Sequence, residues 1–356
     1  MSFITNIRSV AKYESKILVR SWFFRIFTLL AVVFLGFFNF AMMLMEDNFG
    51  LWFAKSVSSN IPYLNLLLLN TGQAVVAVFL SSEFLKRDKK LDTSEVFYVR
   101  PLSNAEYVIG KIWGNLRVFL LLNLLVLAIV LAFNFMASGI TVDWQAYGVY
   151  FLLISLPTLI FIIGLSIFLM LVLRNQALTF ILLLGYIGLT LFYIQDKFYY
   201  LFDYMVYNLP LFKSTIVGFS SLELILNHRA IYFFAGLGFI FFTIFLFKRL
   251  PNARRSHYPW LFLSLCMFLL AGTAGYRHVR SILREGEIRA LYTSINNKYV
   301  HEPKMAIDWY DISVEQKPET IRSVVGMKGT ALATSEIFTF CLNPGLKVGE
   351  VKEGEK

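Results

Sequence analysis

Cysteine, histidine and charged residues are all scarce in this chain of 356 residues. Cys266 and Cys341 are its two cysteines, which excludes a small fold held together by several disulfides. Charged residues make up 16% of the chain, against about 25% in soluble domains. No segment matches the phosphate-binding pattern G-x-x-x-x-G-K-[ST] or the zinc-binding pattern H-E-x-x-H. His301-Glu302 begins the second pattern, but Met305 stands where its second histidine is needed. The sequence therefore predicts neither an ATPase nor a zinc peptidase.

Apolar residues are abundant instead. They make up 57% of the chain, with 36 Phe and 18 Tyr, against about 45–50% in soluble domains. One soluble core cannot hide that much apolar surface, so the composition indicates a membrane protein. It also excludes disorder, coiled coil and collagen-like folds. The net charge of +10 does not indicate nucleic acid, because most basic residues lie in short segments between apolar runs.

Several apolar runs are long enough to cross a bilayer, which takes about 20 mostly apolar residues. We count seven of them: Ile26–Met45, Ile61–Ser81, Ile112–Phe135, Tyr147–Leu173, Ala177–Tyr193, Ile231–Phe247 and Tyr258–Tyr276. The first is too long for a cleaved signal peptide and no small-residue cleavage site follows it. The predicted fold class is an all-α polytopic membrane domain followed by a small extracytoplasmic β-rich segment.

The distribution of Lys and Arg predicts the orientation. Sixteen lie on one side of the spans: Arg8, Lys12, Lys16, Arg20, Arg25, Lys86, Arg87, Lys89, Lys90, Arg100, Lys111, Arg174, Lys248, Arg249, Arg254 and Arg255. The opposite loops carry four: Lys55, Lys197, Lys213 and Arg229. We therefore expect a multi-pass protein of the cytoplasmic (inner) membrane, with a cytoplasmic N-terminus and an extracytoplasmic C-terminus. Heptahelical receptors have the opposite orientation.

The middles of the predicted spans contain no ionisable residue. Arg117 comes nearest, and we expect it to snorkel to the cytoplasmic interface. Proton and ion relays across a bilayer normally need ionisable side chains at mid-depth. Their absence argues against a proton-coupled carrier, a pump relay or a voltage sensor. Pro157 is expected to kink the fourth span.

Buried amides form a possible polar seam. Asn65, Asn70 and Gln73 fall within one wedge of the second span, and Asn123 lies in the third. Such amides hold helices together by hydrogen bonds in many membrane proteins. They can also line a translocation path or a subunit interface, and the sequence leaves both interpretations open.

Residues 1–25 form an amphipathic helix with basic residues on one face, and we expect it to lie at the membrane interface. Glu14 interrupts its apolar face. A carboxylate there costs free energy unless it finds a partner, so it either contacts another protein or reaches water at the rim.

The longest cytoplasmic loop, residues 83–111, ends in a capping box. Ser103 is a suitable N-cap and Glu106 follows three residues later, so a helix should begin at Asn104 and run into the third span. The apolar stretch Val96–Val99 in this loop suggests a docking surface.

The layout resembles the membrane subunit, or permease, of a type-2 ABC transporter. The resemblance rests on the N-terminal interfacial helix, on the loop pattern R-P-L-S-x-x-x-Y-x-x-G-K at Arg100–Lys111, and on the irregular stretch Asp196–Arg229. It implies that the loop docks a separate ATPase, with these residues at the contact: Tyr98, Arg100, Pro101, Leu102, Ser103, Asn104, Glu106, Tyr107 and Lys111. It also implies re-entrant external helices that turn at Asn208-Leu209-Pro210.

The same resemblance implies a non-catalytic subunit that binds no cofactor or metal and draws on ATP through its partner. A second permease half, from a homodimer or a paralogue, would complete the transporter. The chain departs from the family in its seventh span and external tail, since a plain permease half ends inside after six spans. The predicted permease domain covers residues 26–276.

The tail, residues 277–356, changes in composition. Arg277–Arg289 should be helical, and Met305–Val314, Thr320–Val325 and Ile337–Leu342 alternate like strands, with a turn at Asn343-Pro344-Gly345. The stretch FTFCLNPGLKVGEV resembles the opening strands of M1-type aminopeptidases, a family with large permease fusions. That resemblance implies an incomplete domain: either a fragment of a longer protein or a relative that lost its peptidase.

Two alternatives to a transporter remain open. One is a membrane anchor that presents the external β-domain and transports nothing. The other is a membrane-embedded transferase, for which Asp196 and Asp203 are the external carboxylates close to spans, at a spacing that puts both on one face of a helix.

Overall fold

The computed structural model describes residues 3–44, 57–82, 102–136, 141–214, 218–219, 221–247, 258–316, 320–335, 337–340, 342 and 346–352. The chain divides into two compact units, Met1–Arg280 and Ser281–Lys356, and each is described by itself.

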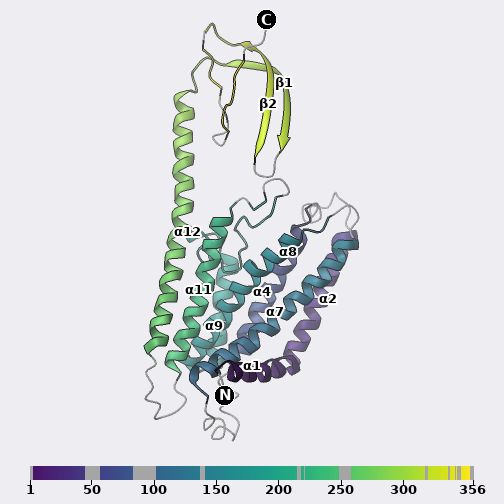
Figure 1. Cartoon of the computed structure of the whole chain (residues 1–356), viewed down its shortest axis with the longest axis vertical. Helices are drawn as coiled ribbons and strands as arrows, with labels where there is room; N and C mark the ends of the chain where they lie inside the picture. The colour runs from purple at the N-terminus through teal and green to yellow at the C-terminus, as the bar shows by residue number, and fades with distance from the viewer. Residues whose placement is uncertain are drawn as a thin grey trace. The chain divides into compact units, whose positions relative to one another are not determined.

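The first unit is a bundle of helices (Figure 1). Its elements are α1 (Phe3–Arg20), α2 (Trp22–Leu44), α4 (Asn60–Ser82), α7 (Asn104–Met136), α8 (Trp144–Tyr150), the π-helical turn η1 (Phe151–Ser155), α9 (Leu156–Leu173), α10 (Gln176–Leu189), the π-helical turn η2 (Thr190–Ile194), the 3₁₀ turn η3 (Phe198–Tyr200), α11 (Leu222–Leu246) and the first part of α12 (Tyr258–Lys298). The described residues contain seven helical segments long and apolar enough to cross a membrane, as predicted.

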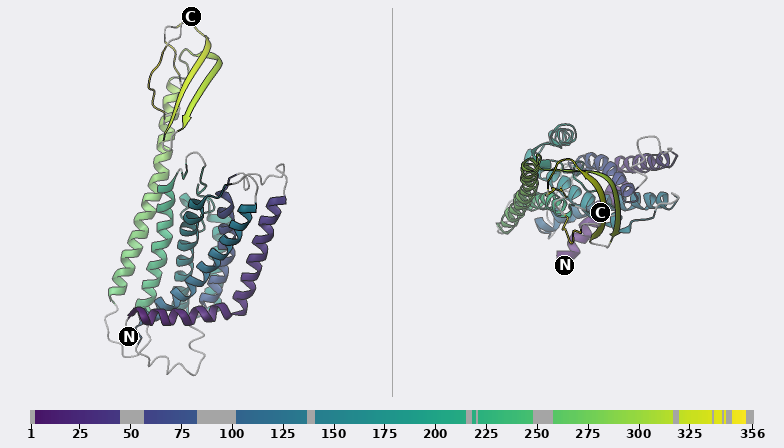
Figure 2. Two further views of the ribbon diagram at one scale, coloured as in Figure 1. Left: turned by 45° about the vertical axis from the view of Figure 1, so that its right-hand side comes forward. Right: turned by 90° about the horizontal axis from the view of Figure 1, so that it is seen from above.

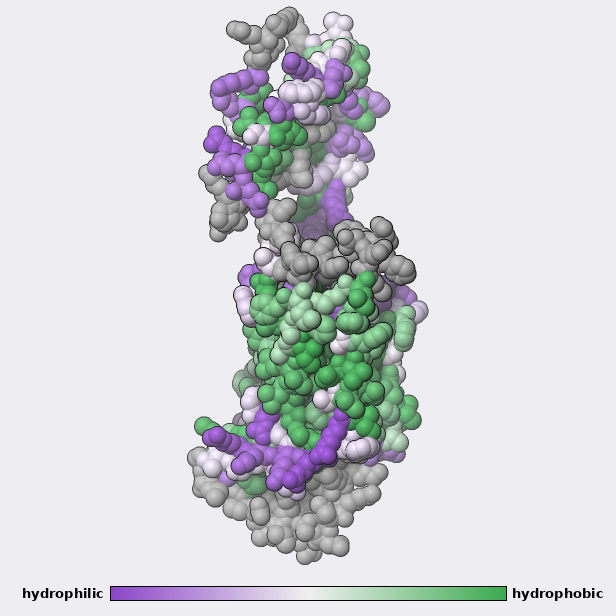
Figure 3. Space-filling view, turned by 90° about the vertical axis from the view of Figure 1, so that its right-hand side faces the viewer, coloured by the Kyte–Doolittle hydropathy of each residue, from purple (hydrophilic) through white to green (hydrophobic). Residues whose placement is uncertain are grey.

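Two of these segments differ from the predicted spans. The sixth begins at Leu222 rather than at Ile231, so it takes in His228 and Arg229. The seventh continues beyond Tyr276 to Lys298 without a break, which confirms that Arg277–Arg289 is helical. On the face shown in Figure 3, hydrophobic residues form a broad band across the middle of the first unit.

Helix α1 lies across one end of the bundle and packs on the start of α7 (Figure 2). Two glycines of α7, spaced one helical turn apart, allow this close approach. A Cβ atom at Gly110 would lie 2.7 Å from the Cβ atom of Val10, and one at Gly114 would lie 2.7 Å from the Cβ atom of Glu14. Small residues at this spacing let helix backbones approach closely in membrane proteins.

The chain takes an irregular path between η2 and α11. The described residues of this irregular segment (195–214, 218–219 and 221) form η3, short turns, bends and an isolated bridge between Ser214 and Gly218. The re-entrant helices implied by the resemblance are therefore wrong for these residues, and Asn208-Leu209-Pro210 forms a bend rather than a turn between helices. Three consecutive residues here, Phe198–Tyr200, have positive φ values of 51–62°, which a right-handed α-helix excludes.

The second unit contains an antiparallel hairpin of β1 (Met305–Gln316) and β2 (Ile321–Ala331). The first two predicted strands are confirmed and extend further than expected. A bulge between Ile307 and Trp309 shifts the register by one residue. The third predicted strand, Ile337–Leu342, is wrong: its described residues join no strand ladder, and Thr339 instead donates its N–H to the carbonyl oxygen of Pro303. The predicted turn at 343–345 lies outside the described residues.

The contact between α1 and α7 yields a stability prediction. Gly114→Ala should lower the free energy of unfolding by about 1–3 kcal/mol, because the new methyl group overlaps Glu14 and the backbone of Ala11. Gly185→Ala in α10 is the matched control, since nothing lies within 4 Å of its added Cβ atom. Thermal unfolding of the purified protein in detergent measures both, and equal melting temperatures would contradict the close contact.

Candidate functional site

The predicted capping box is present at the start of α7. The backbone N–H of Ser103 donates to Glu106 Oε2 over 2.6 Å, and the backbone N–H of Glu106 donates to Ser103 Oγ over 3.2 Å. Helix α7 begins at Asn104 as predicted. Tyr98, Arg100 and Pro101, also predicted to contact an ATPase, lie outside the described residues.

Half of the six other predicted docking residues, Glu106, Tyr107 and Lys111, are buried. Glu106 accepts a hydrogen bond from Asn6 of α1 over 2.9 Å. The ring of Tyr107 stacks on Phe247 with centroids 5.5 Å apart, and both Glu106 and Tyr107 are buried. Asn104 donates to the carbonyl oxygen of Phe247. Of the described residues in this set, only Leu102, Ser103 and Asn104 retain appreciable exposure.

Glu14 and Lys111 form a buried ion pair between α1 and α7. Lys111 Nζ lies 3.2 Å from Glu14 Oε1, and the two side chains are 1% and 4% exposed. The carboxylate on the apolar face of α1 thus has a partner inside the chain, in place of the external protein or the water at the rim that the sequence suggested. Removing one member would leave an uncompensated buried charge.

Arg117, which the sequence analysis expects to snorkel to the cytoplasmic interface, reaches α1. Its Nη2 donates to the carbonyl oxygen of Ala11 over 2.8 Å, and its Nε donates to Ser15 Oγ. Ser15 in turn donates to the carbonyl oxygen of Gly114 over 2.6 Å. The start of α7 is therefore bound to α1 by an ion pair, hydrogen bonds and close backbone contact together.

The predicted polar seam separates into two groups. Asn70, Gln73 and Asn123 meet Ser155 of η1 in one hydrogen-bonded cluster: Asn123 donates to Gln73 over 2.8 Å, and Ser155 donates to Asn123 over 2.7 Å. Asn70 donates to both Asn123 and Ser155.

Asn65 stands apart from that cluster. It forms a reciprocal amide pair with Asn39 of α2, at 2.7 and 3.0 Å. All four predicted amides are buried and hydrogen-bonded to other helices. This arrangement favours the first of the two open interpretations, in which amides hold helices together.

Arg229 is buried inside a helix, although the sequence analysis counted it with the loop residues. It is 2% exposed in α11 and reaches the fourth span. Its Nε donates to the carbonyl oxygen of Leu153 over 2.6 Å, and its Nη2 donates to Thr158 Oγ1 over 2.8 Å. Pro157 lacks the N–H that would otherwise bond Leu153 in an α-helix. Arg229 supplies the missing donor, so Pro157 was the sequence signal that a donor was needed nearby.

The same guanidinium also binds the irregular segment. Arg229 Nη1 donates to the carbonyl oxygen of Tyr204 over 2.8 Å. The hydroxyl of Tyr63 donates to the carbonyl of Val206 over 3.3 Å. His228 and His278 contact the carbonyl oxygens of Tyr200 and Tyr199 through Nε2, at 3.0 and 2.9 Å. Side chains from three helices, α4, α11 and α12, thus satisfy backbone carbonyls of a partly buried segment that has no regular hydrogen bonding of its own.

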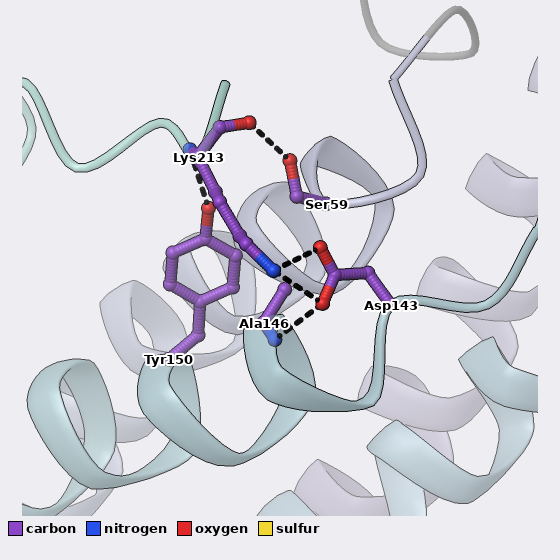
Figure 4. Close-up of polar contacts among 5 residues, drawn as sticks. All are labelled: Ser59, Asp143, Ala146, Tyr150 and Lys213. Atoms are coloured by element: carbon purple, nitrogen blue, oxygen red, sulfur yellow. Dashed lines mark hydrogen bonds and ion pairs between the residues drawn. The ribbon is translucent and has the colours of Figure 1, made fainter. Parts of the chain in front are cut away.

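Lys213, near the C-terminal end of the irregular segment, binds this segment to the neighbouring helices (Figure 4). Its Nζ lies 2.6 Å from Asp143 Oδ2, and Asp143 also caps α8 by accepting from the backbone N–H of Ala146 over 3.0 Å. The backbone N–H of Lys213 donates to the hydroxyl of Tyr150, and its carbonyl accepts from Ser59. Lys213, which the sequence analysis counted with the loop residues, therefore holds the irregular segment to α8 and the start of α4.

Asp196 and Asp203 do not share a helix face, so the carboxylate pair considered for a transferase is wrong. Asp196 is exposed in a turn, whereas Asp203 is 2% exposed and accepts from the backbone N–H of Asn208 over 2.8 Å. Burial raises the pKa of the Asp203 carboxyl above its ordinary value, against the lowering effects of the backbone donors and of Arg229.

Among the residues that the structure describes, no group of three or more His, Cys, Asp or Glu is placed to hold a metal ion. Neither a comparison with models of protein families nor one with curated protein sequences finds a match to this chain. The functional argument therefore rests on the residues and their contacts.

Replacing Arg229 tests its role as the donor to the fourth span. Arg229→Met should lower the free energy of unfolding by about 1–3 kcal/mol, because the carbonyl of Leu153 and the buried carbonyl of Tyr204 lose this donor. Arg277→Met, at an exposed arginine of α12, should change it by less than about 0.5 kcal/mol. Chemical unfolding in mixed micelles measures both variants, and equal effects would contradict the assigned role.

The raised pKa of Asp203 predicts a pH dependence. The folded state binds this proton more tightly than the unfolded state, so ionisation destabilises the fold as pH rises above the ordinary value of 3.8. Asp203→Asn removes this effect and keeps an acceptor for Asn208. Between about pH 4 and about pH 7 the wild type should therefore lose stability relative to the variant. A difference in melting temperature that stays constant over this range would show that Asp203 does not titrate as described.

Proposed function

We propose that this chain is the membrane subunit of a type-2 ABC transporter. In this proposal the N-terminus, α1 and the loop 83–111 lie in the cytoplasm and the second unit lies outside. A separate ATPase docks on the loop and supplies the energy of ATP hydrolysis, and the chain itself is not an enzyme. A second permease half, from a homodimer or a paralogue, completes the pathway for a substrate that is moved across or out of the membrane.

The contact between α1 and α7 is the observation that carries this proposal. The Glu14–Lys111 ion pair and the glycine contacts at Gly110 and Gly114 join the two helices directly after the loop. Helix α2 begins at Trp22, only two residues after the end of α1 at Arg20. A push on the loop would therefore move α1, α7 and α2 together. A protein driven by an external ATPase needs such a connection between the docking site and its membrane helices.

The burial of three residues in the predicted docking set limits where an ATPase could bind. Glu106, Tyr107 and Lys111 bind within the chain, so an ATPase would engage the loop ahead of them, with Leu102 and Ser103 at its edge. Substitutions in the loop itself are thus better tests than substitutions at Glu106, which would also disturb the capping box and the bond to Asn6.

A membrane anchor is the second candidate. It is favoured by the separate compact unit Ser281–Lys356, which a plain permease half lacks. In this alternative the helices hold the hairpin unit at the outer surface and no ATPase is needed.

Co-purification distinguishes the two candidates. We expect affinity purification from native membranes in mild detergent, followed by mass spectrometry, to recover a P-loop ATPase in stoichiometric amount. Arg100→Glu should abolish this recovery, because it reverses charge in the loop that would dock the ATPase. Lys197→Glu is the matched control and should retain this recovery. The start of α7, directly after the loop, contacts Phe247 at the C-terminal end of α11. Lys197 precedes the N-terminal end of α11, so it lies at the opposite end of this helix. Recovery of the wild-type chain without any P-loop ATPase would overturn the transporter proposal in favour of an anchor.

A further inference from the structure

Helix α1 has three distinct sides. Its buried side, with Ala11, Glu14, Ser15 and Leu18, faces α7. A second side is apolar and partly exposed, and includes Phe3 and Tyr13, which are 47% and 60% exposed. The third side carries a basic stripe, which we define as Arg8, Lys12, Lys16 and Arg20. These four exposed residues recur at every fourth position and therefore share one face.

The basic stripe has no acidic partner within the described part of the chain. Two acidic residues on or against α1, Glu14 and Glu106, are already engaged by Lys111 and by Asn6 with Ser103. Four like charges on one face repel one another. Binding an anionic surface would relieve that repulsion.

The position of α1 indicates which anionic surface this is. Trp22, which begins α2 two residues after α1 ends, is 74% exposed, and the membrane-crossing helix α2 thus follows directly on the exposed apolar side of α1. Figure 3 shows a hydrophilic strip along the edge of the hydrophobic band, at the end of the unit where α1 lies. A helix with apolar and basic sides at this level lies in the headgroup region, where its Lys and Arg side chains reach lipid phosphates.

We propose that the basic stripe of α1 is a binding surface for anionic phospholipid headgroups, and that occupancy of this surface stabilises the contact between α1 and α7. The binding is electrostatic and multivalent, since each Lys or Arg near an anionic membrane surface adds to the attraction. Because the opposite side of α1 is bound to α7 through Glu14–Lys111 and Arg117, headgroups at the stripe hold the start of α7 as well. This inference needs only the membrane-crossing helices and is independent of an ATPase partner.

The test compares phosphatidylglycerol with phosphatidylcholine in nanodiscs of otherwise equal composition. We expect phosphatidylglycerol to raise the melting temperature of the wild type, and native mass spectrometry to show retained phosphatidylglycerol. The fourfold variant Arg8→Gln, Lys12→Gln, Lys16→Gln, Arg20→Gln should lose the shift and bind phosphatidylglycerol at least about tenfold more weakly. Raising the salt concentration should weaken wild-type binding, because exposed charges are screened.

Two controls separate a specific surface from general charge and from disrupted folding. Changing Arg277, Arg280, Arg284 and Arg289 to Gln removes the same charge from exposed positions of α12 and should leave the shift intact. The charge-preserving variant Arg8→Lys, Arg20→Lys should also retain it. Free glycerol phosphate should give no shift, since the proposal requires headgroups arranged at a bilayer surface.

Three outcomes would overturn the proposal. Equal loss in the α12 variant would show a general charge effect. An equal shift from glycerol phosphate would indicate a free-phosphate site. Unchanged phosphatidylglycerol binding by the fourfold variant, combined with loss of a co-purifying protein, would assign the stripe to an acidic protein surface instead.

Discussion

A buried backbone carbonyl must find a hydrogen-bond donor, and the first unit is arranged around that requirement. Pro157 removes one helical N–H, and the irregular segment between η2 and α11 lacks regular hydrogen bonding. Arg229 satisfies both places at once, because its planar guanidinium carries several donors in a fixed geometry. Tyrosine, threonine and histidine side chains provide the remaining contacts. The buried arginine is therefore better understood as a structural donor than as part of a charge relay.

Other buried or partly buried charges also pair inside the chain. Glu14 forms an ion pair with Lys111, and Lys213 forms one with Asp143. Each pair joins elements that are far apart in sequence: the interfacial helix to the third span, and the irregular segment to the start of the fourth. These pairs set which helices are neighbours more than they add to stability, since desolvation offsets much of the attraction between buried charges.

The sequence predicted the membrane-crossing helices well because apolar runs of this length have few alternatives. It also predicted the start of α7 at Asn104, since the capping box is a local pattern. It failed where the outcome depends on contacts distant in sequence. Arg229 was assigned to a loop because a charged residue near a span normally marks its end, and nothing local shows that Leu153 is its partner. The strand predicted at Ile337–Leu342 has the right alternation but no partner strand among the described residues. The sequence also could not show that Glu106 and Lys111, which the resemblance placed in the docking loop, bind α1, because their partners lie about a hundred residues earlier.

The Arg229–Leu153 bond has a consequence for the order of events during synthesis. Its two residues are 76 positions apart, so the fourth span emerges from the ribosome well before its donor. At roughly 5–20 residues per second this interval lasts several seconds. During that time the carbonyl of Leu153 has to keep a water molecule or a temporary neighbour. Arg229 can reach this carbonyl only after α11 has been made, so the sixth span completes the hydrogen bonding of the fourth.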